Sequence, residues 1–269
     1  MFHETIFVDE RPIHVEGDGK ETIIMIHGWP DTEHLWVRQV AALAPHHRCV
    51  HFTLPGFEPG AKRETFSIDA LCAFIGRVIN AVSQDAPVVL LLHDWGCVFG
   101  YQFQVRHPER VSRIIGVDVG DSASLRREAS TKLLLMVLTY QLWLAVAWMT
   151  GGRIGNWMTY SMARLLRCPT IGPQVVAQQA YPYYMTWLAG SGSYRSDARP
   201  FEPACPMLYI YGTRKPLMFH AASWLARLRQ NPGNRILPFE TGHWVMVEKP
   251  EAFNEAVLKW LAVDAPVEA

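Results

Sequence analysis

The sequence predicts an α/β fold in which a mostly parallel sheet is covered by helices on both faces. Short apolar segments typical of buried strands alternate with segments whose apolar residues recur at helical spacing. The alternation stops between Gly120 and Pro203, where only helical patterns occur, and it resumes at Met207. We therefore expect a core domain formed by residues 1–120 and 204–269. Residues 121–203 are expected to form a helical cap over the strand ends.

Each element follows from its local pattern. The chain begins with two short strands that indicate a hairpin, and the helix at 66–82 is the clearest because Ile68, Leu71 and Ile75 continue at the same spacing to Val82. The predicted strands are 5–9, 13–16, 22–26, 48–53, 87–92, 111–118, 207–211 and 235–239, and the predicted core helices are 35–44, 66–82, 96–106, 220–228 and 251–261.

Composition indicates a globular protein without a nucleic-acid partner. The chain has 269 residues, 49% of them hydrophobic, and its formal net charge is zero. The five cysteines are an odd number without metal-ligand spacing, so we expect buried, reduced thiols in a cytoplasmic protein. No ligand cluster or phosphate-binding glycine loop occurs, so we expect no metal and no organic cofactor. A monomer or a homodimer fits this composition equally well.

One uncharged stretch requires a membrane test. Leu133 to Thr150 contains 18 residues without a charge, which is the lower limit for a membrane-spanning helix. Thr139, Tyr140 and Gln141 interrupt it, and it lies between strand patterns. We therefore expect a cap helix and no integral membrane span, whereas contact with a membrane surface stays open.

The segment His93-Asp94-Trp95-Gly96 follows the apolar run 88–92 and carries the chemistry. A buried strand that enters a tight turn before a helix forms an elbow, which lifts a nucleophile above the sheet. An ionised carboxylate at its tip attacks sp³ carbon, and activated water then hydrolyses the resulting ester. A serine-type esterase is disfavoured because the elbow has no hydroxyl. The alternative is an ordinary turn in which Asp94 caps the next helix.

The elbow is one of five motifs in order along the chain. The other four are His27-Gly28-Trp29-Pro30-Asp31, Leu54-Pro55-Gly56-Phe57, Pro108-Glu109-Arg110-Val111, and Gly242-His243-Trp244 with Glu248-Lys249-Pro250-Glu251. With them the chain resembles the α/β-hydrolase fold with a cap domain, in the epoxide hydrolase and haloalkane dehalogenase group. The matching pieces span residues 23–260. The resemblance implies a cis peptide before Pro30 and an oxyanion hole formed by the backbone N–H groups of Trp29 and Trp95.

His243 is the expected base, because it follows the last strand in a loop where its imidazole can take a proton from water. His27 and His93 are expected to be structural. The resemblance implies a triad acid after the 207–211 strand, but Lys215 stands there, and a cation cannot orient an imidazole. Some haloalkane dehalogenases carry the acid after the strand that follows the elbow helix. Asp118 occupies that place and is our candidate, with Glu240 as a fallback.

The side chains that stabilise the leaving atom, an oxygen or a halide, distinguish an epoxide hydrolase from a haloalkane dehalogenase. The resemblance implies two cap tyrosines that donate to the oxygen of an opening epoxide. Tyr140 and Tyr184 are our candidates, and Tyr183 is an alternative to Tyr184. In a dehalogenase, the Trp95 indole and a second donor would bind halide, but Trp29 stands where Asn often serves.

The aromatic cap predicts a small apolar substrate, for which we name Trp95, Trp143 and Trp187 as binding residues.

Two departures from the family pattern leave a third hypothesis open. Leu92 stands two residues before Asp94, where a small residue is usual, and Thr53 replaces an Asp. A crowded elbow is compatible with a catalytically silent binding protein. Our main hypothesis is hydrolysis of epoxides to vicinal diols through an ester on Asp94. The alternatives are a haloalkane dehalogenase and a silent protein of the same fold.

Overall fold

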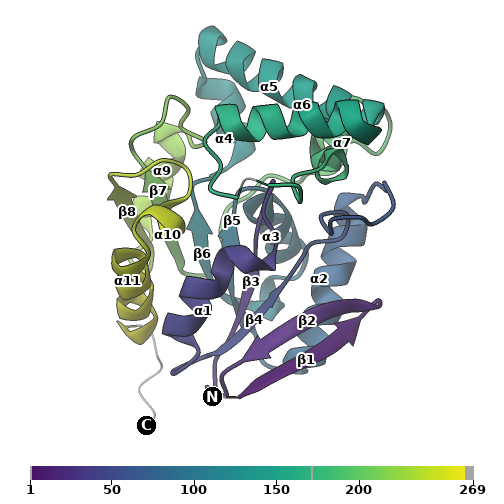
Figure 1. Ribbon diagram of the computed structural model, residues 1–269. Coiled ribbons are helices and arrows are strands. Elements are labelled where there is room, and N and C mark those ends of the chain that lie inside the picture. Colours follow the sequence, from purple (N-terminus) through teal and green to yellow (C-terminus); the bar gives the residue numbers. More distant parts are fainter. Residues whose placement is uncertain (1, 171, 264–269) are drawn as a thin grey trace.

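The computed structural model describes residues 2–170 and 172–263 and contains an eight-stranded sheet between layers of helices (Figure 1). The strand order is β1-β2-β4-β3-β5-β6-β7-β8, in which β1 and β2 are antiparallel and β3 to β8 are parallel. The predicted fold class is therefore confirmed. The strands are β1 (His3–Val8), β2 (Arg11–Glu16), β3 (Thr22–Ile26), β4 (Arg48–Phe52), β5 (Val88–His93), β6 (Val111–Val117), β7 (Met207–Gly212) and β8 (Arg235–Phe239).

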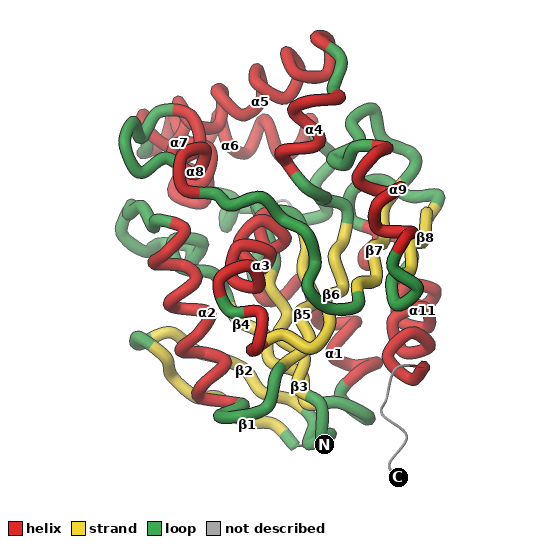
Figure 2. The backbone as a smooth tube through the Cα atoms, turned by 180° about the vertical axis from the view of Figure 1, so that it is seen from behind, coloured by secondary structure: helices red, strands yellow, loops and turns green. Residues whose placement is uncertain are grey.

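Helices cover both faces of the sheet. One face carries α1 (Val37–Leu43) and α11 (Pro250–Val263), and the other carries α2 (Ile68–Val82), α3 (Trp95–Arg106) and α9 (Ala222–Gln230), as Figures 1 and 2 show from opposite sides. Short helical turns precede or follow them at η1 (Glu33–Trp36), η2 (Pro108–Arg110) and α10 (Val245–Glu248).

The sequence placed most element ends within a few residues. The clearest difference lies at 35–44, where a 3-10 turn precedes α1. Trp36 has φ −92° and ψ 0°, so the α-helix begins only at Val37.

Burial explains why the central strands were recognisable. Every residue of β3 and of β5 is buried, because helices cover these strands on both sides. A continuous apolar run is the sequence signature of such a strand. Helix α2 shows the complementary pattern, since its buried residues recur every three or four positions and Ser67 caps its first turn by accepting a hydrogen bond from the Ala70 N–H.

The segment between β6 and β7 is helical and lies above the strand ends (Figure 1). We refer to residues 121–203 as the proposed cap. The Thr170 hydroxyl donates to Asp31 of the core over 2.7 Å, and the Gln179 amide donates to the Phe57 carbonyl over 3.1 Å. These bonds hold the proposed cap over the sheet. Its helices are α4 (Ser122–Glu128), α5 (Thr131–Thr150), α6 (Gly152–Leu165), η3 (Ala177–Ala180), α7 (Tyr181–Trp187) and α8 (Tyr194–Asp197).

The structure bears on two expectations from composition, namely that the cysteines are buried and unpaired and that the uncharged stretch forms a helix of the proposed cap. All five cysteines are unpaired; four are buried, whereas Cys205 is partly exposed. Helix α5 is long and apolar enough to cross a membrane by length and composition alone, and most of it is not buried inside the protein.

Candidate active site

Two carboxylates leave neighbouring strands at the same edge of the sheet. His93 of β5 pairs with Val117 of β6, so Asp94 and Asp118 begin adjacent loops at the same level. Both have positive φ angles, 52° for Asp94 and 70° for Asp118. Such backbone is unusual for a residue with a side chain and is typical of a strained functional turn. Asp94 forms the expected elbow between β5 and α3.

The crowded elbow expected from Leu92 is relieved by Gly100 on α3, the helix that begins at the elbow. A Cβ placed on Gly100 would lie 2.5 Å from both terminal methyl carbons of Leu92. A small residue before Asp94 would leave space at this turn, and here Gly100 leaves that space instead. Gly28 performs a similar role in front of the elbow, because a Cβ there would lie 2.3 Å from Asp94 Oδ1.

The two oxygens of Asp94 have different partners. Asp94 Oδ1 accepts a hydrogen bond from the Trp29 N–H over 2.8 Å, and Oδ2 lies 3.5 Å from His243 Nε2. Trp29 is joined to Pro30 by the cis peptide that the resemblance implied. Burial disfavours the charged form of Asp94, but the hydrogen bond and charge of His243 and the Trp29 N–H together lower its pKa. The side chain is therefore held as a carboxylate.

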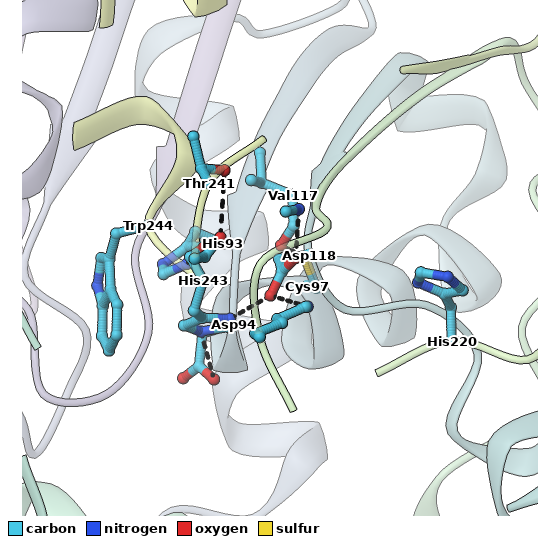
Figure 3. Close-up of polar contacts among 12 residues, drawn as sticks. His93, Asp94, Cys97, Val117, Asp118, His220, Thr241, His243 and Trp244 are labelled. Atoms are coloured by element: carbon cyan, nitrogen blue, oxygen red, sulfur yellow. Dashed lines mark hydrogen bonds and ion pairs between the residues drawn. The ribbon is translucent and has the colours of Figure 1, made fainter. Parts of the chain in front are cut away.

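His243 links Asp94 to Asp118 (Figure 3). Its Nδ1 donates to Asp118 Oδ2 while its Nε2 faces Asp94. Burial works against the imidazolium, but the two carboxylates outweigh it and raise the pKa of His243 to about 9. Asp118 also accepts from the Gly212 N–H over 2.9 Å. This is the geometry of a nucleophile, a base and an orienting acid.

Lys215 pairs with the acid. Its ammonium contacts Asp118 Oδ2, the same oxygen that receives His243 Nδ1, and both members of this ion pair are buried. Burial disfavours ionisation of Asp118, but the charges of Lys215 and His243 lower its pKa. The cation that stands in the expected position of the acid is therefore the counter-ion of Asp118. The fallback Glu240 is exposed to solvent.

The remaining histidines near the elbow serve the loops, as expected. His27 Nε2 accepts from the Leu54 N–H over 2.9 Å, and its Nδ1 contacts the Gly28 carbonyl, so it ties two loops together. His93 packs against His243 with 4.5 Å between ring centroids, and Figure 3 shows the two side by side. Burial lowers the pKa of His27 to about 4 and that of His93 to about 3, so both are neutral.

A cavity of about 790 Å³ opens above Asp94 and His243. Trp29 lines its floor, and the cap contributes Tyr140 and Tyr183. The rings of these two tyrosines lie 6.2 Å apart, and burial raises the pKa of each, so both phenols remain protonated donors. The other lining residues are Leu165, Leu166, Arg167, Pro169, Arg214, Lys215, Pro216, Leu217, Phe219, Gly242, Trp244, Val247 and Glu248.

The expectation for Tyr184 is corrected in favour of its neighbour. Tyr184 stacks on Trp148 with 4.2 Å between ring centroids and does not line this cavity. Tyr183 instead contacts the rings of Trp29 and Trp95 at 5.8 and 5.2 Å. The reason is helical geometry, because successive side chains on α7 point about 100° apart.

Three tryptophans expected to bind substrate also lie outside the lining of this cavity. Trp95 is buried against Phe99 beneath Tyr183. The Trp143 indole donates to the Met158 carbonyl over 3.0 Å, and the Trp187 indole donates to Gln141 over 2.7 Å. Their hydrogen bonds support the packing of the cap helices. Only the backbone of Trp95, which begins α3 next to Gly28, remains placed for the expected oxyanion hole.

Sequence reasoning missed the role of Gly100 in making room for Leu92. The signal that could have revealed it is a glycine eight positions after the bulky Leu92, about one turn into the elbow helix. It also missed the link between core and cap at Asp31, which accepts from the Trp244 indole as well as from Thr170. Among residues 2–170 and 172–263, no group of three or more His, Cys, Asp or Glu side chains is arranged to hold a metal ion.

The sheet order, the elbow and the Asp94–His243–Asp118 arrangement are those of a hydrolase fold. A sequence profile of the alpha/beta hydrolase family matches residues 23–256, and the chain belongs to this family. A solved structure of Bacillus megaterium epoxide hydrolase in complex with an inhibitor superposes with a TM-score of 0.74. It is 20% identical and covers 96% of this chain and 100% of that one, which establishes the shared fold.

Curated relatives match shorter segments. The chain is 30% identical over 122 residues to epoxide hydrolase 1 of Caenorhabditis elegans, covering 44% of this chain and 30% of that protein. It is 27% identical over 118 residues to a cis-3-alkyl-4-alkyloxetan-2-one decarboxylase of Xanthomonas campestris pv. campestris, covering 40% of this chain and 38% of that protein. The matched segments thus span about a third of the length of these two relatives.

Proposed function

We propose that the protein hydrolyses epoxides to vicinal diols through a covalent ester on Asp94. The observation that carries the proposal is the placement of this one carboxylate. It lies between the Trp29 N–H and His243 Nε2, at the base of a cavity to which the cap supplies Tyr140 and Tyr183. The epoxide hydrolase relatives support the same chemistry.

In the first step, Asp94 Oδ2 attacks an epoxide carbon while Oδ1 stays with the Trp29 N–H. A new carbon–oxygen bond forms, the ring carbon–oxygen bond breaks, and the departing oxygen takes a proton from one of the two cap phenols. Burial keeps Tyr140 and Tyr183 protonated by raising the pKa of each. Their hydroxyls therefore donate where the negative charge develops.

Before the second step, His243 gives its proton to the phenolate that the first step leaves, which restores the phenol and the neutral imidazole. The neutral His243 then removes a proton from water, and the hydroxide attacks the carbonyl carbon of the Asp94 ester. The negative charge forms on the oxygen held by the Trp29 N–H, with the Trp95 N–H as the second donor. When this intermediate collapses, the ester carbon–oxygen bond breaks and the departing oxygen takes the proton of the hydroxyl that water supplied. This restores the carboxylate and releases the diol. The net reaction is epoxide plus water to diol.

The electrostatics of His243 change between the two steps. In the resting protein, Asp94 and Asp118 both raise the pKa of His243, to about 9. Ester formation removes the charge of Asp94, so one of the two causes disappears and the imidazole loses its proton more readily. The base thus becomes active when the ester that it must hydrolyse has formed.

A second candidate function uses the same site on a four-membered ring. One relative is named a cis-3-alkyl-4-alkyloxetan-2-one decarboxylase. An oxetan-2-one, like an epoxide, is a strained oxygen ring open to attack by a carboxylate. Its decarboxylation yields carbon dioxide and an alkene, so the products distinguish the two functions.

The first experiment uses the variant His243→Gln, which retains Asp94 but lacks the base. We would incubate it separately with styrene oxide, 1-bromohexane and a dialkyl oxetan-2-one, and then measure intact and peptide masses. We expect a stable adduct on Asp94 equal to the full mass of the epoxide. The matched control is the double variant Asp94→Asn/His243→Gln, which should stay unmodified.

Each outcome has a distinct meaning. An adduct from bromohexane alone, with loss of hydrogen bromide, would identify a dehalogenase and overturn the epoxide proposal. Carbon dioxide from the wild-type protein and the oxetanone would identify the second candidate. No adduct on a protein whose circular dichroism is native would identify a silent binding protein.

A further inference from the structure

We propose that the outer face of the cap docks on a lipid bilayer that contains anionic phospholipid. The cap face is formed by exposed apolar side chains of α5 and α6, and its members are Leu135, Trp143, Val146, Ile154, Trp157 and Leu165. Figures 1 and 2 show these two helices side by side at the end of the molecule farthest from β1 and β2.

The cap face is largely apolar and extends over two helices. On α5 the exposed residues 135, 139, 143 and 146 recur every three or four positions, whereas Leu144 is buried on the opposite side. Trp143 and Trp157 join the two helices, with 6.4 Å between their ring centroids. Ile154 is 66% exposed and Leu165 is 73% exposed. Exposed apolar side chains gathered on two adjacent helices mark an interaction surface.

The charges around the cap face select an anionic partner. Residues 129–196 contain no Asp or Glu, although the whole chain is neutral. Their basic residues, all exposed, are Lys132, Arg153, Arg164, Arg167 and Arg195. Apolar side chains with interfacial tryptophans and surrounding cations are typical of helices that lie on anionic lipid. A second copy of the chain is disfavoured, since face-to-face packing would bring like charges together without a compensating acid.

Helix α5 lies on the bilayer in this arrangement and does not cross it. The strands before and after the cap are neighbours, because Ile114 of β6 pairs with Met207 of β7. A single crossing would place these hydrogen-bonded strands on opposite sides of the membrane. It would also withdraw Tyr140 from the cavity above Asp94.

Docking places the cavity beside the lipid. Leu165 belongs to the cap face, and it also lines the cavity next to Arg167. An apolar substrate dissolved in the bilayer would then enter without crossing water. This delivery step rests on the proposed function, whereas docking itself does not.

The test measures sedimentation of the full chain with sucrose-loaded vesicles of phosphatidylcholine, with or without about 30 mol% phosphatidylglycerol. We expect binding to the anionic vesicles, weakened by salt. The double variant Ile154→Gln/Trp157→Gln should lower the partition coefficient at least about tenfold. Phe7→Gln is the matched control, since Phe7 is equally exposed at 70% but lies on β1, and it should bind as the wild type does.

Three results would overturn the proposal: no binding to either vesicle, equal binding by the double variant, or a concentration-dependent dimer that the double variant abolishes. The last result would assign the cap face to contact between copies. Circular dichroism confirms that each variant is folded. Since the assay contains no epoxide, failure of the proposed chemistry would leave its outcome unchanged.

Discussion

Replacing Lys215 by Met tests whether the buried cation tunes the base. Lys215 and His243 both hydrogen-bond to Asp118 Oδ2, in a site where Lys215 and Asp118 are almost fully buried. Met retains the length of the side chain but removes its charge. Among the described residues, the carboxylate then keeps His243 and the Gly212 N–H as its hydrogen-bond partners.

The distance between the two cations sets the size of the expected change in the pKa of His243. Two nitrogens bonded to one oxygen lie within about 6 Å of each other, and at an effective dielectric constant of about 20 their charges repel by about 3 kcal/mol. Removing Lys215 should therefore raise the pKa of His243 by about two units. The free energy of unfolding should also fall by about 3 kcal/mol, because a buried ion pair loses one partner.

The assay is single-turnover hydrolysis of the Asp94 ester as a function of pH. Below the titration of His243, Lys215→Met should hydrolyse the ester about 100-fold more slowly than the wild type, with its half-maximal pH moved up by about two units. Formation of the ester should change far less. Arg214→Met removes an exposed cation from the same loop and should move the half-maximal pH by less than about half a unit. An unchanged pH midpoint in Lys215→Met would refute the reasoning.

The other predictions concern the cap and the base. Tyr183→Phe should slow ester formation about 10- to 100-fold, because a phenol donor is lost, whereas Tyr184→Phe should leave it unchanged in the same stopped-flow assay. The pKa of His243 is raised from 6.5 to about 9, so its stabilisation is complete below pH 6.5 and is lost as pH rises through about 9. Urea denaturation should show this loss, about 3 kcal/mol, in the wild type and not in His243→Gln. Burial raises the pKa of Asp31 to about 6. Thr170→Val should therefore destabilise the protein by about 1–2 kcal/mol at pH 8 and by less at pH 5, where Asp31 is protonated, as thermal denaturation would show.

The sequence predicted the fold because its signals are local. Strands β3 and β5 are buried on both faces and appear as uninterrupted apolar runs. Asp94, Asp118 and His243 each follow a strand, and the carboxyl ends of parallel strands meet at one edge of the sheet. The expectation that these three side chains lie together therefore needed only the order of the strands. The structure brings them together.

What the sequence could not supply depends on distances between separate elements. Whether Tyr183 or Tyr184 faces the cavity depends on the rotation of a short helix, and an error of one residue exchanges them. In sequence, Lys215 stands where an acid is expected and argues against catalysis. In space, it neutralises an acid that arrives from another strand.

The same reasoning applies to Leu92, which would crowd the turn if the residue facing it had a side chain. Gly100 lies in α3 and removes that crowding. The space at the elbow is therefore preserved, but a glycine after the nucleophile provides it in place of a small residue before the nucleophile. A departure from a family motif therefore indicates lost function only when its structural neighbours fail to compensate. At this elbow, Gly100 leaves the space that Leu92 needs, and Asp118 neutralises the charge of Lys215. The departures at Leu92 and Lys215 are therefore compensated, and they favour an active site over a silent one.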